Sequence, residues 1–320
     1  MGGRRSLRVA AAVAVALLAV PAAQGAARFH AQALDAKLRA EPGVLSVLVE
    51  RDGRLIFERY YRGAGRSGRL DVFSVTKSVT STLVGIALHD GLLRGLDQRL
   101  SKFFPRDVQH ARDKRVRKIT LRHLLTMTAG YRDVAAIRSD DWVRTQIDRQ
   151  LAADPGQSWG YDNGSYHLLS AVLSMVTGAP ANRYAQRTLF GPLGIAPTQW
   201  TTDGQGHSLG NTGLRLSSRD LVRLGELYLH GGRRNGRQIV PASYIHVATR
   251  KVTAVGQGVG YGYGWWTLAG AAHPGFAALG YGGQAVAVYP RQNLVVVVTG
   301  SGDKIPRVLD RLILPALGIR

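Results

Sequence analysis

The sequence predicts an α+β fold, in which an antiparallel sheet made from both ends of the chain is flanked by helices and carries an inserted, mainly helical region. Runs rich in β-branched residues and bounded by turn residues gather near the two ends. The middle of the chain has helical periodicity and helix-cap signals instead. With 320 residues, 45% of them hydrophobic, the chain is long enough for one large domain or two interleaved ones.

Residues 1–27 have the layout of a cleavable secretory signal. Three arginines precede an apolar run over residues 9–20, and Pro21 and mostly small residues follow through Ala27. The run falls short of the roughly 20 apolar residues that span a bilayer, so an uncleaved anchor is the less favoured alternative. The chain has no cysteine, which excludes disulfides and thiolate catalysis. These features predict a bacterial periplasmic or secreted protein from which the signal is removed.

The elements of the remaining chain follow from periodicity, caps and turns. The pattern predicts a helix over 31–40, strands over 44–50 and 55–61 joined at Asp52-Gly53, a helix from about 77 to 88, helices over 121–127, 165–176, 182–189 and 218–229, strands over 263–268, 284–289 and 294–299, and a closing helix over 307–314 that Pro315 would end. This order predicts a sheet domain of residues 28–76 and 251–320 and a helical domain of residues 77–250.

The net charge of +21 indicates affinity for anionic surfaces. The basic residues are spread through the chain, and the one dense run, Lys114–Lys118, has no aromatic stacking platform or nucleic-acid motif beside it. We therefore expect a solvated basic surface with an anionic bacterial envelope as its partner, and no specific nucleic acid.

The candidate nucleophile is Ser74, which precedes Lys77 by three residues at the start of a predicted helix. This spacing places a hydroxyl and an amine on one helix face within hydrogen-bond reach. The alternative is an ordinary N-cap serine with an exposed lysine. A second S-x-x-K, Ser301 to Lys304, follows an apolar run and has the character of a polar loop.

Two further segments offer partners for this serine. Tyr161 and Asn163 lie two residues apart in a predicted loop, so an extended backbone would point both side chains into one pocket. Gln284 follows a glycine-rich turn, and its N–H could form an oxyanion hole with that of Ser74. The alternatives are a core tyrosine with a capping asparagine, and a β-bulge.

In this order and at these intervals, the three elements resemble the serine β-lactamase and penicillin-binding protein superfamily. More narrowly, the chain is similar to the β-lactamase-related serine hydrolases, which include class C β-lactamases, esterases and 6-aminohexanoate-dimer hydrolases. The segments that carry the resemblance, which runs from about residue 40 to 315, are residues 73–78, 124–130, 161–164, 213–221 and 280–284. The resemblance implies that Ser74 is acylated, that Lys77 is the general base and that Tyr161 is the second proton-transfer group. To act as a base, Lys77 needs a pKa well below the free value of roughly 10.4.

One departure bears on the substrate. Where lactamases and transpeptidases keep Lys-Thr-Gly, this chain has Tyr281, Gly282 and Gly283. The cation and hydroxyl that hold a β-lactam carboxylate are therefore missing, which favours a small neutral ester or amide as substrate. The alternatives are a β-lactamase or DD-peptidase that acts on β-lactams or cell-wall peptides, and an inactive homologue that binds envelope ligands.

Other candidate residues have less support. Ser158 lies in G-x-S-x-G, but no buried strand is expected before it and no helix immediately after it, as a nucleophile elbow requires. His207 is expected to face the cleft, and Trp200 is either a packing residue or a wall of the acyl pocket. No histidine has metal-ligand spacing with a carboxylate, so we expect no metal and no other cofactor.

Overall fold

The computed structural model describes residues 29–132, 139–256, 258–268, 273–302 and 308–319. The predicted signal segment and Lys304 of the second S-x-x-K lie outside these residues. Among the helices of the described ranges, none has the length and apolar composition needed to cross a bilayer.

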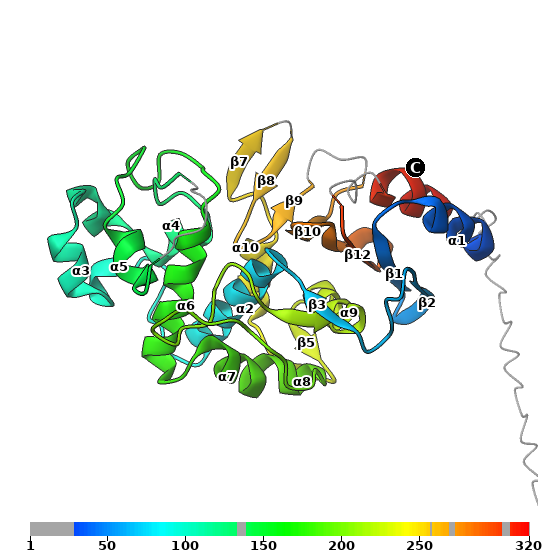
Figure 1. Cartoon of the computed structure of the whole chain (residues 1–320), viewed down its shortest axis with the longest axis horizontal. Helices are drawn as coiled ribbons and strands as arrows, with labels where there is room; N and C mark the ends of the chain where they lie inside the picture. The colour runs from blue at the N-terminus through cyan, green and yellow to red at the C-terminus, as the bar shows by residue number, and fades with distance from the viewer. Residues whose placement is uncertain (1–28, 133–138, 257, 269–272, 303–307, 320) are drawn as a thin grey trace, which may run out of the picture.

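One antiparallel sheet of eight strands is the main β-structure of the described residues, and both chain ends contribute to it (Figure 1). Strands from the two ends pair directly, since Val44 lies opposite Gly300 and Arg51 opposite Leu294. The order across the sheet is β2 (Arg54–Tyr60), β1 (Val44–Arg51), β12 (Leu294–Gly300), β11 (Gln284–Tyr289), β10 (Phe276–Gly280), β9 (Trp266–Thr267), β8 (Val259–Tyr261) and β7 (Thr253–Gly256). Two short sheets pair β3 (Arg69–Asp71) with β4 (Arg215–Ser217), and β5 (Arg233–Arg234) with β6 (Arg237–Gln238). The α+β prediction is confirmed.

Helix α2 is buried from Val75 to Ala87. Figure 1 shows α3, α4, α5 and α6 gathered to one side of α2, with β1, β2, β10 and β12 on the other. The α-helices are α1 (Ala31–Ala40), α2 (Val75–His89), α3 (Pro105–His110), α4 (Leu121–Leu125), α5 (Trp142–Ile147), α6 (Asn163–Thr177), α7 (Ala181–Ala185), α8 (Gly191–Leu193), α9 (Ser218–Leu229), α10 (Ala242–Ala248) and α12 (Leu314–Ala316). Single turns of 3₁₀- or π-helix are η1 (Leu100–Lys102), η2 (Lys114–Lys118), η3 (Gln186–Phe190), η4 (Pro290–Gln292) and η5 (Leu309–Ile313).

Alternation along the strands divides the core into two layers. On β12, Val295 and Val297 belong to the larger hydrophobic cluster, which holds α2 and α9, whereas Val296 and Val298 belong to the cluster with α1 and η5. Side chains of a strand point alternately to opposite faces, so an unbroken run of valines covers both. The site elements α2 and α9 thus share one face of the sheet.

The predicted strand over 263–268 is wrong in extent, because only Trp266–Thr267 is strand. Gly264 has a φ of +78°, and its carbonyl accepts a hydrogen bond of 2.6 Å from the Ser78 hydroxyl on α2. A Cβ at this position would lie 2.9 Å from the backbone oxygen of Lys77. The chain therefore turns at a glycine that packs directly against α2.

The closing helix also differs from the prediction, since helical backbone continues through Pro315 to Ala316. Pro315 lies in the first turn of α12, after the π-turn of η5. The backbone up to Ile313 is a π-turn, so the α-helical hydrogen bond that Pro315 cannot make is not required at this point.

Candidate active site

A strained turn places Ser74 at the N-terminus of α2. Just after β3, the Asp71 carboxylate accepts a hydrogen bond of 2.7 Å from the backbone N–H of Phe73. Phe73 has a φ of +47°, a left-handed conformation that costs an L-residue roughly 1–2 kcal/mol. Ser74 itself is right-handed helical, and its side chain makes no cap hydrogen bond to the helix. The Ser74 hydroxyl is thus directed to other partners than the backbone of α2.

Those partners are the two groups that the sequence predicts. The Ser74 Oγ lies 2.7 Å from the Tyr161 hydroxyl and 2.9 Å from the Lys77 Nζ. Either hydroxyl could donate in the first contact. Lys77 is buried, with 2% of its surface exposed, so it is not the exposed lysine of an ordinary capped helix. One hydroxyl therefore lies between an amine and a phenol, as proton transfer to and from an attacking oxygen requires.

Lys77 is held by three acceptors from three parts of the chain. Its Nζ donates to the Ser74 Oγ, to the Asn163 Oδ1 at 2.7 Å and to the backbone oxygen of Asn211 at 3.3 Å. The predicted proximity of Asn163 is present in the structure. Sequence reasoning missed Asn211, which contributes a carbonyl from an irregular segment before β4. A backbone acceptor leaves no signature in residue type, so no motif pointed to it.

An aromatic wall supports Tyr161. Its ring stacks on Trp266 of β9, with a centroid distance of 6.4 Å and an interplanar angle of 13°. Trp159 packs edge-on to the same indole at 5.9 Å. The Lys77 Nζ lies 4.8 Å from the centroid of the Tyr161 ring, within range of a cation–π contact. Sequence reasoning also missed Trp266, although this residue lies in the strand predicted over 263–268, directly after a glycine-rich segment.

The residue between Tyr161 and Asn163 anchors both. Asp162 is buried, and one of its carboxylate oxygens caps α6 by accepting from the Ser165 N–H at 2.7 Å. Gln146 donates to the same oxygen at 3.1 Å, and the Arg149 guanidinium pairs with the other oxygen at 3.0 Å. Because adjacent residues in extended backbone point in opposite directions, this buried pair directs its two neighbours toward Lys77.

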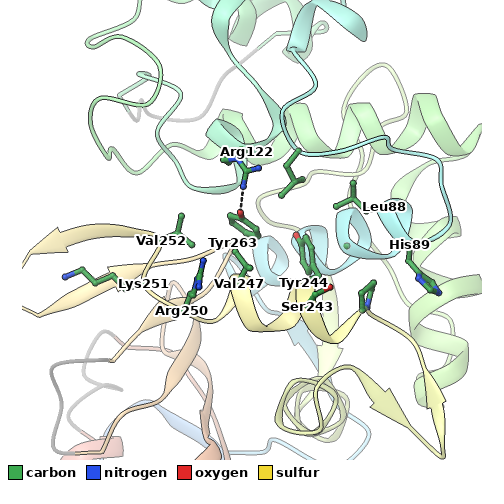
Figure 2. A pocket seen from close by; sticks show the side chains of 13 residues that line it. Leu88, His89, Arg122, Ser243, Tyr244, Val247, Arg250, Lys251, Val252 and Tyr263 are labelled. Atoms are coloured by element: carbon green, nitrogen blue, oxygen red, sulfur yellow. Dashed lines mark hydrogen bonds between the residues drawn. The ribbon is translucent and has the colours of Figure 1, made fainter.

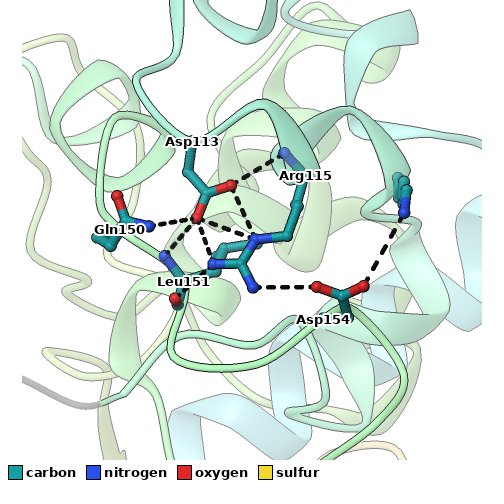
Figure 3. A network of polar contacts seen from close by, with 6 residues as sticks. Asp113, Arg115, Gln150, Leu151 and Asp154 are labelled. Atoms are coloured by element: carbon teal, nitrogen blue, oxygen red, sulfur yellow. Dashed lines mark hydrogen bonds and ion pairs between the residues drawn. The ribbon is translucent and has the colours of Figure 1, made fainter.

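A second network holds the loop that leads to Tyr161 (Figure 3). Arg115 of η2 bridges Asp113 and Asp154, with contacts of 2.6 and 3.0 Å. Asp113 also accepts from the side chain of Gln150 and the N–H of Leu151. The hydrogen bonds from Arg115 hold the pKa of Asp113 well below its usual range. The stability from this carboxylate is therefore present above the ordinary pKa of 3.8 and is lost as the pH falls through the depressed value.

The glycine segment 280–284 forms the tip of a hairpin. Gly280 of β10 lies opposite Gln284 of β11, and Gly282 and Gly283, with φ of +72° and +94°, lie in the turn between them. A Cβ at Gly280 would lie 2.4 Å from the carbonyl of Val72 and 3.3 Å from the backbone nitrogen of Ser74. Strand β10 thus packs against the Val72 carbonyl oxygen at a distance that only glycine permits, and this places it next to the Ser74 N–H.

The side chains at this tip have different surroundings. Tyr281 is 73% exposed and packs edge-on against Phe73 at 5.6 Å. The amide of Gln284 is buried and donates to the Gly300 carbonyl at 2.7 Å. Its side chain therefore ties β11 to β12.

The other candidates are not among the hydrogen-bond partners of the Ser74 hydroxyl in the described residues. Trp200 is a buried core residue whose indole N–H donates to the Leu209 carbonyl, so burial favours its packing role. His207 belongs to a turn held by Asp203, which also pairs with buried His167 at 2.9 Å, and burial lowers the pKa of His207. Ser158 is exposed in irregular backbone without a preceding strand, unlike an elbow serine.

In the described ranges, no group of three or more histidine or carboxylate side chains could hold a metal ion.

Comparison with known proteins identifies relatives across most of the chain. A family model described as "Beta-lactamase" matches residues 31–316. The chain is 23% identical over 237 residues to an uncharacterized protein of Alkalihalophilus pseudofirmus, with 64% of each chain covered. It is 26% identical over 184 residues to an Escherichia coli protein provisionally named D-alanyl-D-alanine carboxypeptidase, covering 48% of this chain and 42% of that one. The chain thus matches less than two thirds of the length of either curated relative.

The fold is shared with solved structures. A Bacillus anthracis protein provisionally named 6-aminohexanoate-dimer hydrolase superposes with a TM-score of 0.75 at 21% identity, over 88% of this chain and 81% of that one. An identity this low establishes the common architecture and no common substrate.

Replacement of Tyr161 by phenylalanine tests the phenol of this site. Tyr161→Phe removes the hydroxyl 2.7 Å from Ser74 and keeps the ring that stacks on Trp266. We expect kcat for p-nitrophenyl butyrate to fall about 10²- to 10⁴-fold, the range for loss of a proton-transfer group. The matched control is Tyr184→Phe, whose hydroxyl binds Asp90 and whose loss should leave kcat unchanged. Equal activity of the two variants would show that the Tyr161 hydroxyl takes no part in proton transfer.

Proposed function

The chain belongs to the Beta-lactamase family, and on that basis we propose that it is a serine hydrolase that cleaves an ester or amide through an acyl-enzyme at Ser74. The observation that carries the proposal is the position of the Ser74 Oγ, 2.9 Å from an amine and 2.7 Å from a phenol. A site that only held a ligand would have no need of both groups beside one hydroxyl.

In the first step, Lys77 in its neutral form takes the proton of Ser74 while the Oγ attacks the substrate carbonyl carbon. The contact between Nζ and Oγ then has the serine as donor, while Nζ still donates to Asn163 and Asn211. The N–H groups of Ser74 and Gln284 stabilise the oxyanion, each donor of this kind being worth roughly 3 kcal/mol.

In the second step, the tetrahedral intermediate collapses and the bond to the leaving group breaks. Tyr161 donates its proton to the departing alcohol or amine, and the proton held by Lys77 restores the phenol through the hydrogen-bonded cluster. Water then attacks the acyl-enzyme with the same groups as base, and the acid is released while Ser74 regains its proton.

The substrate is proposed to be a small neutral ester or amide. The hairpin tip next to Ser74 presents Tyr281, Gly282 and Gly283, which offer an exposed phenol and open backbone in place of an ammonium and a hydroxyl. The aromatic wall of Tyr161 and Trp266 offers an apolar surface beside the nucleophile. Both features suit an uncharged acyl group.

The proposed location is the periplasm or the exterior of a bacterial cell. Support comes from the signal-like residues 1–27 and from the absence of cysteine in the sequence. The net charge of +21 would hold such a protein near the anionic envelope. A substrate drawn from envelope esters or amides would be available there.

Replacement of the nucleophile and of its base tests the mechanism. Ser74→Ala and Lys77→Ala should each lower kcat for p-nitrophenyl butyrate by roughly 10⁴-fold or more, because a nucleophile and its base act as a unit. The matched controls are Ser158→Ala and Ser301→Ala, which should keep wild-type kcat. Circular dichroism of each variant should match wild type, since alanine is well tolerated in a helix. Activity that survives in Ser74→Ala but is lost in Ser158→Ala would show that Ser158, and not Ser74, is the nucleophile.

Comparison of two substrates tests the substrate class and the β-lactamase alternative. Without a cation at position 281, a β-lactam carboxylate loses a charge-assisted hydrogen bond worth roughly 1.5 to 3 kcal/mol, or about tenfold to a hundredfold in binding. Steady-state kcat/KM should therefore be higher for p-nitrophenyl butyrate than for nitrocefin. Tyr281→Lys should raise the value for nitrocefin. A wild-type kcat/KM that is higher for nitrocefin would contradict the proposed substrate class.

A further inference from the structure

A cavity remote from Ser74 lies beside the C-terminal half of α2, between this helix, α10 and the segment that leads into β7 (Figure 2). Its volume is about 710 Å³, within the roughly 300–1,000 Å³ of ligand pockets. Gly85 lines it and follows Ser74 by three helical turns, a distance of about 16 Å along the helix. Within the described chain, its lining includes neither Lys77 nor Tyr161.

The middle of this cavity is apolar. Leu88, Val247 and the ring of Tyr244 form its floor (Figure 2). The Tyr244 hydroxyl donates to the Ser81 carbonyl at 2.8 Å, and its ring lies so close to α2 that a Cβ at Gly85 would come within 2.6 Å of it. The floor is therefore fixed to α2 and is ready to receive an apolar chain.

Basic side chains flank the floor. Arg250 lies at one end of the cavity with its side chain turned inward, the Lys251 side chain next to it extends away from the cavity, and Arg122 lies above the centre (Figure 2). Arg122 is held in place, since it donates to both carboxylate oxygens of Asp97 at 2.9 Å and to the Tyr263 hydroxyl at 2.8 Å. No aspartate or glutamate is among the described residues that line the cavity.

The charges of Arg250 and Lys251 are not neutralised by the protein. Both side chains are exposed, and the ion pairs of the described residues include neither. An anionic group at the Arg250 guanidinium would gain a charge-assisted hydrogen bond, and the neighbouring Lys251 adds to the positive potential there. A cationic ligand would meet repulsion at the same place.

We propose that this cavity is a second ligand site, which binds a small amphipathic anion of the class of medium-chain carboxylates. The carboxylate lies at Arg250, beside the charge of Lys251, and the alkyl chain covers Leu88, Val247 and Tyr244. An inorganic anion would leave the apolar floor in water, and a neutral chain would leave the cations without a partner. The site does not depend on the chemistry proposed for Ser74.

Calorimetric titration of sodium decanoate into the full chain carrying Ser74→Ala tests the site without any turnover. We expect saturable binding of one decanoate per chain. Adding Arg250→Ala and Lys251→Ala should weaken that affinity at least tenfold, because the first removes the charged contact to the carboxylate and the second lowers the positive potential beside it. Unchanged affinity in the double variant, or no saturable binding in its parent, would overturn the proposal.

Two other ligands separate the role of the carboxylate from the role of the alkyl chain. Decylammonium has the same chain with the opposite charge, and acetate has the same head without the chain. Both should bind at least tenfold more weakly than decanoate. Decylammonium that binds as tightly as decanoate would contradict the role of the cations, and acetate that binds as tightly would contradict the role of the floor.

A matched control separates this site from general attraction to a basic protein. Arg233→Ala with Arg237→Ala removes two exposed charges from the strands β5 and β6, outside the cavity, and should leave decanoate affinity unchanged. Leu88→Asp, which places a carboxylate in the floor, should abolish binding. Urea unfolding midpoints equal to that of the parent establish that each variant is folded. An equal loss of affinity in the control would show that net charge alone attracts decanoate.

Discussion

The buried amine of Lys77 is the contact on which the candidate active site depends. A buried lysine is costly unless its N–H groups find acceptors, and here the acceptors come from α2, from α6 and from the segment before β4. Bringing three such atoms to one nitrogen requires these elements to pack in one relative position. The Ser74 hydroxyl is one of the three acceptors, so the same packing that satisfies the lysine also positions the proposed nucleophile.

The positions of Ser74, Lys77 and Tyr161 are stabilised by contacts among residues that do not themselves take part in the proposed reaction. Asp162 anchors the loop between Tyr161 and Asn163 through Arg149 and the N-terminus of α6. On the sheet side, the approach of Gly280 to the Ser74 nitrogen keeps the hairpin tip beside the nucleophile. The hairpin tip itself contributes little to the core, because Tyr281 is exposed and residues 282 and 283 are glycines.

Much of this arrangement could be predicted from residue patterns, because local spacing determines it. The i, i+3 separation of Ser74 and Lys77 is a property of a helix. The shared direction of Tyr161 and Asn163 follows from the extended backbone of Asp162 between them, although Asn163 is the first residue of α6 and does not lie in the loop that the sequence predicts. Asn211 and Trp266 could not be found in this way, since their roles depend on tertiary packing and, for Asn211, on a backbone atom. The bend at Gly264 was missed for a related reason: its cause is the approach of α2, which lies far away in the sequence.

Acylation of Ser74 is the step on which the proposed mechanism rests. Peptide mapping with mass spectrometry, after reaction of the full chain with a fluorophosphonate, locates the acylated residue. We expect one adduct per chain, located on Ser74, and no adduct in a chain whose Lys77 is replaced by alanine. An adduct on Ser158, on Ser301 or on any other residue, with Ser74 unmodified, would contradict the proposed mechanism.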